Sequence, residues 1–111
     1  MPKLMLSNSD SDKTLVVWLE PLGEDYWMNP GDELTFDYED ADYCESVIGE
    51  GNGHFLVSWL AEGFVVWPAA RYGSTVRDRS GAEVDCGHQR PADVDLAWRR
   101  AGCFGPRDQG R

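Results

Sequence analysis

The stretch ELTFDYE, residues 33–39, alternates polar and apolar residues without interruption. Successive side chains of a β-strand point to opposite faces, so Leu34, Phe36 and Tyr38 would share one face. The other face would carry Glu33, Thr35, Asp37 and Glu39. We therefore expect a half-buried strand with a wet, acidic face, entered through the Asn-Pro-Gly-Asp turn at 29–32.

Further strand patterns lie on either side of this stretch. Runs rich in β-branched and aromatic residues occupy 14–20, 26–28, 54–60 and 64–67, and weaker ones lie at 74–79 and 82–85. Turn residues separate them every 8 to 12 residues or so. The pattern predicts a mainly all-β fold: an antiparallel β-sandwich or small barrel of six to seven short strands. The aromatic residues expected to fill its core are Trp18, Phe36, Tyr38, Phe55, Trp59, Phe64 and Trp67.

One helix is expected near the C-terminus, at about 91–101. Val94, Ala97, Trp98 and Ala101 recur at helical spacing and would form one apolar face. Pro91 suits the first turn. A helix this short needs tertiary packing, so Trp98 should dock on the body of the protein.

The chain of 111 residues suits one domain. We expect a flexible N-terminal segment at 1–13, a single β-sandwich domain with its helix at 14–102, and a flexible tail at 103–111. No apolar run is long enough to span a membrane, and the N-terminus does not match a secretory signal. Three cysteines at unrelated spacings, Cys44, Cys86 and Cys103, do not form a disulfide framework. A cytoplasmic location is expected.

Charge is distributed unevenly along the chain. The net charge is −10, yet residues 14–70 contain twelve carboxylates and no Lys or Arg. Nucleic acids and anionic membranes require clustered cations, so neither is an expected partner. Complementary charge speeds the encounter of proteins, and aromatic anchors hold the complex.

These observations predict a non-catalytic acidic protein-interaction module, of the inhibitor, immunity or regulatory kind, that binds a basic protein partner. An alternative is a soluble domain in which the acidic face only contacts solvent. The sequence does not indicate the oligomeric state or a ligand for the glycine-rich loop at 49–53. The residues expected to bind the partner are Asp25, Tyr26, Trp27, Glu33, Asp37, Glu39, Asp40, Asp42, Tyr43 and Glu45.

Two segments resemble those of small actinobacterial proteins of uncharacterised function. They are WLEPLGEDYWMNPGDELTF at 18–36 and RYGSTVR at 71–77. The resemblance implies a small β-rich domain and transfers no site residues. The phrase NPGDELTF is also similar to the turn and early strand of cupredoxins. That likeness implies a β-sandwich.

An alternative function is a metal-binding, cupredoxin-like domain, in which Zn or Cu would be bound by Cys44, His54, Cys86 and His88. Thiolate and imidazole ligands together suit these metals. The spacings match no standard metal motif, so the first expectation is no cofactor. No pattern arranges a nucleophile, a base and an oxyanion site, so an enzyme is not expected.

Overall fold

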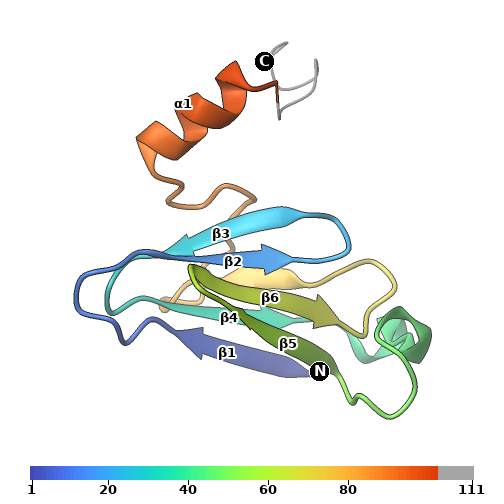
Figure 1. Ribbon diagram of the computed structural model, residues 1–111. Helices are drawn as coiled ribbons and strands as arrows, with labels where there is room; N and C mark the ends of the chain where they lie inside the picture. Colours follow the sequence, from blue (N-terminus) through green and yellow to red (C-terminus); the bar gives the residue numbers. More distant parts are fainter. Residues whose placement is uncertain (103–111) are drawn as a thin grey trace.

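The computed structural model describes residues 1–102, and the expected tail at 103–111 lies outside them. The fold is mostly β, with two sheets and one helix near the C-terminus, as predicted (Figure 1). The strands are β1 (Lys3–Ser7), β2 (Leu15–Leu19), β3 (Glu24–Met28), β4 (Glu33–Asp37), β5 (Phe55–Leu60), β6 (Gly63–Pro68) and β7 (Thr75–Arg77). Two 3-10 turns, η1 (Asp40–Asp42) and η2 (Glu45–Val47), follow β4, and α1 spans Ala92–Arg100.

Two open sheets share the strands. One has the order β1-β4-β7 and the other β3-β2-β6-β5. The pairing is antiparallel except between β2 and β6, which run parallel. This parallel pair corrects the expected antiparallel arrangement. Both strands are central in their sheet and almost wholly apolar, which is typical of strands buried on two faces. An apolar run does not reveal the direction of its strand, so the sequence pattern could not predict the parallel pairing.

One core lies between the two sheets and contains buried side chains from both. Leu34, Phe36 and Tyr38 are buried as the alternation predicts, and Glu39 is exposed. Asp37 was expected on the wet face, but it is only 3% exposed. The reason is Arg77 of the neighbouring strand β7, whose Nε donates to Asp37 Oδ2 at 3.1 Å.

The N-terminal residues join the fold, contrary to the flexible segment expected at 1–13. Residues 3–7 form β1, which pairs along its length with β4. Asn8 is 1% exposed. Its side-chain nitrogen donates to the carbonyls of Lys13 and Met28, so it ties the loop after β1 to the end of β3. The apolar residues of β1 alternate over too few positions for the sequence to distinguish a strand from a flexible terminal segment.

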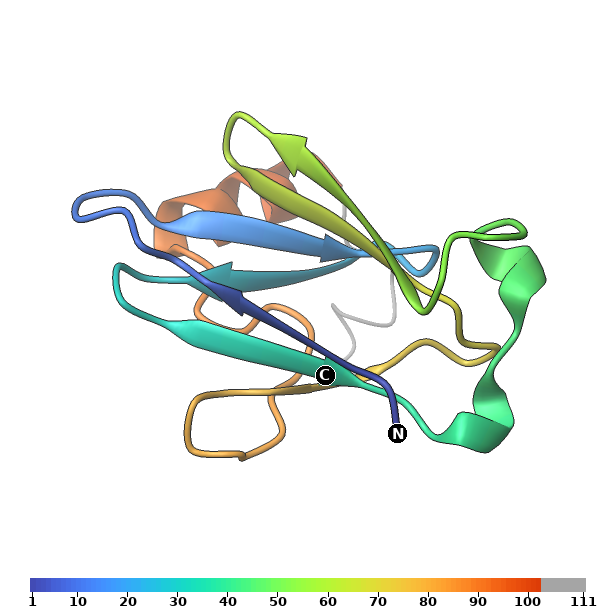
Figure 2. The ribbon, with the colours of Figure 1, turned by 90° about the horizontal axis from the view of Figure 1, so that it is seen from below.

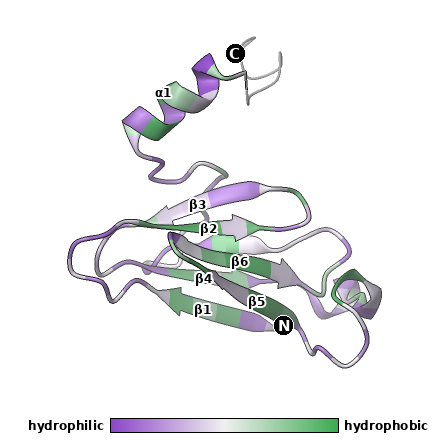
Figure 3. Ribbon diagram, viewed as in Figure 1, coloured by the Kyte–Doolittle hydropathy of each residue, from purple (hydrophilic) through white to green (hydrophobic). Residues whose placement is uncertain are grey.

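Apolar residues dominate β2 and β6, whereas the start of β3 and much of α1 are polar (Figure 3). Trp59 was expected in the core but is 79% exposed. It lies near the end of β5, the last strand of its sheet, and its ring packs against that of Phe64, with 4.7 Å between the ring centroids. Within residues 1–102, no helix is long and apolar enough to cross a membrane.

Gly63 begins β6 where the backbone of β2 passes very close. A Cβ built at Gly63 would overlap the carbonyl oxygen of Val16, its partner in the parallel ladder. Backbone atoms cannot move aside as a flexible side chain can. Only glycine therefore fits this position.

We expect Gly63→Ala to lower the free energy of unfolding by about 3 kcal/mol, through overpacking of the β2–β6 pair. Gly53→Ala is the matched control. Its new Cβ has no heavy atom within 4 Å, so only its positive φ is penalised, by about 1 kcal/mol. Urea denaturation followed by tryptophan fluorescence measures both. Equal losses in the two variants would contradict the close approach of Val16.

Candidate functional site

A buried ion pair joins β3 to the segment before α1. Asp25 is 2% exposed and accepts two hydrogen bonds from Arg90, from Nε at 2.8 Å and from Nη2 at 2.7 Å. Trp27 Nε1 also donates to Asp25, at 2.7 Å. This bidentate geometry fixes the guanidinium in direction as well as position.

Arg90 continues the network into the helix. Its Nη1 donates to Asp95 of α1 at 2.7 Å, and its guanidinium lies 5.0 Å from the ring centroid of Trp98. Trp98 packs against Trp18 at 5.7 Å and Trp27 at 6.3 Å, measured between ring centroids. The helix therefore docks through Trp98, as its apolar face predicted, although no residue of α1 is fully buried.

The pKa values in this network follow its contacts. Burial raises the pKa of Asp25, but hydrogen bonds from Arg90 and Trp27 outweigh burial, and the pKa lies below its ordinary value. The hydrogen bond to Asp25 raises the pKa of Arg90. Cys86 Sγ lies 3.5 Å from Asp25 Oδ1, and desolvation beside this carboxylate raises the pKa of the thiol. A raised pKa favours the unreactive thiol.

The structure divides the residues expected to bind a partner. Asp25, Tyr26 and Asp37 were expected at the surface but are buried, so their side chains are not presented to a partner. Tyr26 belongs to the core and stacks edge-on against Phe36. Trp27 is half-buried beneath Trp98, and Glu33 pairs with Arg79 at 3.4 Å. The remaining five stay together in the chain: Glu39, Asp40, Asp42, Tyr43 and Glu45.

We call residues 39–50, which contain both 3-10 turns, the acidic end. They lie together beyond the strand ends in Figures 1 and 2. Among residues 1–102, only one of the five carboxylates here forms an ion pair: Asp40 with the N-terminal amino group, at 3.1 Å. Tyr43 is 38% exposed, and its ring packs on His54 at 5.2 Å. The five carboxylates are Glu39, Asp40, Asp42, Glu45 and Glu50.

Arginines pair with five of the carboxylates elsewhere in residues 1–102. Arg77 pairs with Asp37 and Glu83, Arg79 with Glu33, Arg90 with Asp25, and Arg99 with Asp95. The twelve acids of residues 14–70 therefore do not form one face. At the acidic end, four carboxylates form no ion pair within the described residues, and they lie within twelve consecutive residues.

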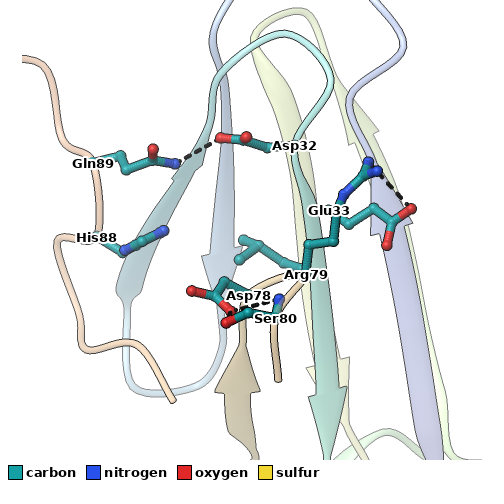
Figure 4. A pocket seen from close by; sticks show the side chains of 8 residues that line it. Asp32, Glu33, Asp78, Arg79, Ser80, His88 and Gln89 are labelled. Carbon is teal, nitrogen blue, oxygen red and sulfur yellow. Dashed lines mark hydrogen bonds and ion pairs between the residues drawn. The ribbon is translucent and has the colours of Figure 1, made fainter. Parts of the chain in front are cut away.

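A shallow polar pocket of about 290 Å³ lies elsewhere, at the turn before β4 (Figure 4). Gln89 donates to Asp32 across its rim at 2.8 Å, and Ser80 donates to Asp78 at 2.6 Å. His88 also lines the pocket. Because these polar groups bond to one another, the pocket presents a closed network of turn contacts rather than groups converging on a ligand.

The four candidate metal ligands are not brought together. Within the described residues, no group of three or more His, Cys, Asp or Glu could hold a metal ion. Cys44 Sγ contacts Ser46 Oγ at 3.2 Å, and His54 Nδ1 meets the Tyr38 hydroxyl at 2.8 Å. Cys86 faces Asp25, whereas His88 lines the polar pocket. Cys86 and His88 do not share a strand, since residues 86–89 form turns with a single bridge at His88.

Sequence reasoning missed Arg90, the cation of the buried pair. The sequence offered one signal, the position of Arg90 directly before Pro91, which is the N-cap residue of α1. Its partner Asp25 lies 65 residues away in the chain, and spacing alone does not reveal such a contact.

Comparisons with known proteins found no match: no family model, no curated protein and no solved structure is similar to the chain.

We expect Arg90→Met to lower the free energy of unfolding at pH 7 by about 3–5 kcal/mol, because it leaves the Asp25 carboxylate buried without its cation. Arg99→Met is the matched control: its ion pair with Asp95 is half-exposed and is worth less than about 1 kcal/mol. Thermal or urea unfolding measures both. Similar small losses would contradict a central role for the Asp25–Arg90 pair.

The same variant should reverse the pH dependence of stability. In the native chain the pKa of Asp25 is lowered, so its contribution is present above the unfolded pKa and is lost as the pH falls below about 4. In Arg90→Met, burial alone would raise the pKa of Asp25. Stability should then increase as the pH falls from about 7 to about 5. Unfolding midpoints measured across this range test the sign, and parallel profiles would contradict it.

Proposed function

We propose that the chain is a non-catalytic interaction module that binds a basic protein through its acidic end. The observation that carries the proposal is the close grouping of five carboxylates in residues 39–50, none of which pairs with an arginine among residues 1–102. The carboxylates of Asp25, Asp37 and Asp95 each meet an arginine, whereas the acidic end has a single ion pair, to the N-terminal amino group. A surface of this kind attracts a cationic partner over distance.

Tyr43 supplies an anchor beside this charge. Its side chain is partly exposed and lies near Asp42 and Glu45 in the chain, and its ring packs against the His54 ring. Interfaces combine such aromatic anchors with charged rims. The smaller set Glu39, Asp40, Asp42, Tyr43 and Glu45 thus replaces the broad face expected from sequence.

The charge distribution also limits the class of partner. Arg77, Arg79, Arg90 and Arg99 each pair with a carboxylate, so these four guanidinium groups are not available to hold phosphates. A protein partner is therefore favoured over a nucleic acid. We place the module in the cytoplasm as part of this proposal, in keeping with the free thiols of Cys44 and Cys86.

Charge reversal tests the surface. Glu39→Lys/Glu45→Lys acts on the acidic end, and Asp12→Lys/Asp85→Lys is the control, made at exposed acids elsewhere. Each double substitution changes the net charge of −10 by four, to −6. We expect a basic protein from the source lysate to bind the native chain and the control at about 50 mM salt and to be released at about 500 mM.

Binding of that protein, once purified, should be at least about tenfold weaker to Glu39→Lys/Glu45→Lys in a calorimetric titration. Equal loss in the two double variants would show that net charge, rather than the acidic end, is responsible. Capture that is insensitive to salt, or the absence of any basic partner, would contradict the proposal.

A further inference from the structure

The free edge of β5 differs from the other three sheet edges. Residues 86–88 cover the edge of β3, through Gly87 N–H to Asp25 O at 2.6 Å and Trp27 N–H to His88 O at 2.9 Å. Residues 82–84 cover β7, through Val84 N–H to Val76 O. β1 carries Lys3, a charge that discourages edge pairing. Within residues 1–102, β5 pairs only with β6, and nothing covers its outer side (Figure 2).

The composition of β5 makes this bare edge unusual. Its sequence, FLVSWL, contains no charged residue and no proline. Trp59 is 79% exposed, and Leu56 and Leu60 are each 39% exposed. An uncovered, uncharged edge strand of this kind is a template for pairing with another strand.

We propose that β5 pairs antiparallel with β5 of a second copy of this chain, about a twofold axis at Ser58. The two four-stranded sheets would then form one continuous sheet. This inference goes beyond the proposed function, because it rests on backbone and apolar groups of β5 rather than on carboxylates.

The sequence of β5 is complementary to itself in this register. Phe55 and Val57 point toward the core, so Trp59 shares their face, and Leu56, Ser58 and Leu60 share the other. With Ser58 opposite itself, Trp59 would lie opposite Val57 and Leu56 opposite Leu60. Aromatic and β-branched residues are favourable cross-strand pairs. In every pair the two side chains also lie on the same face of the sheet, as a twofold axis perpendicular to the sheet requires.

The lack of charge along β5 also bears on its occupant. A basic partner would find no carboxylate along β5 itself, so a second copy fits this edge better.

Sedimentation equilibrium from about 10 μM to about 1 mM protein tests the proposal, since moderate interfaces dissociate in this range. Each copy carries a net charge of −10, so self-association should be tighter at about 500 mM salt than at about 50 mM. This salt dependence is opposite to that expected for a basic partner at the acidic end. A monomer at all concentrations in the higher salt would overturn the proposal.

Substitutions locate the interface. We expect Trp59→Lys to weaken association at least about tenfold. Ser58→Lys should have a similar effect although it keeps Trp59, because it places two like charges opposite each other at the axis. Met5→Lys is the control, because Met5 is 60% exposed on β1 of the other sheet. Circular dichroism confirms folding. Association unchanged in both β5 variants, or lost equally in the control, would overturn the assignment to β5.

Discussion

The buried pair between Asp25 and Arg90 holds the segment before α1, and through Asp95 the helix itself, against β3. Desolvating two charges is costly, and here the bidentate contact, the Trp27 donor and the Asp95 carboxylate compensate for it. Once Arg90 is fixed, Trp98 is positioned over two tryptophans of the sheet. A helix with no fully buried residue thereby gains a defined orientation.

The same use of arginine shapes the surface of the protein. Cations from residues 77–99 neutralise carboxylates that β3 and β4 place inside or at the sheet edge. The acidic end lies beyond the strand ends and receives only the terminal amino group. The acidic end groups four carboxylates that have no ion pair within residues 1–102, and it is the proposed docking surface.

Edge protection follows from the same folding pattern. The turns that bring Cys86 and His88 to β3, and Glu83 to β7, cover two edges with backbone hydrogen bonds. The short β5–β6 hairpin brings no such segment to β5. Its uncharged sequence leaves a surface that is suited to backbone pairing rather than to solvent.

Local periodicity predicted the β class, the strands at 33–39, 54–60 and 64–67 and the helix with Trp98, because each depends on neighbouring residues along the chain. It failed where distant residues meet. Asp37 and Asp25 look like surface acids until Arg77 and Arg90 reach them from 40 and 65 residues away. Trp59 looks like a core residue until its strand proves to be an edge. The sequence by itself determined which residues favour strands or a helix, whereas tertiary structure decided which charges are buried and which edge is bare, since both depend on pairings that no local pattern encodes.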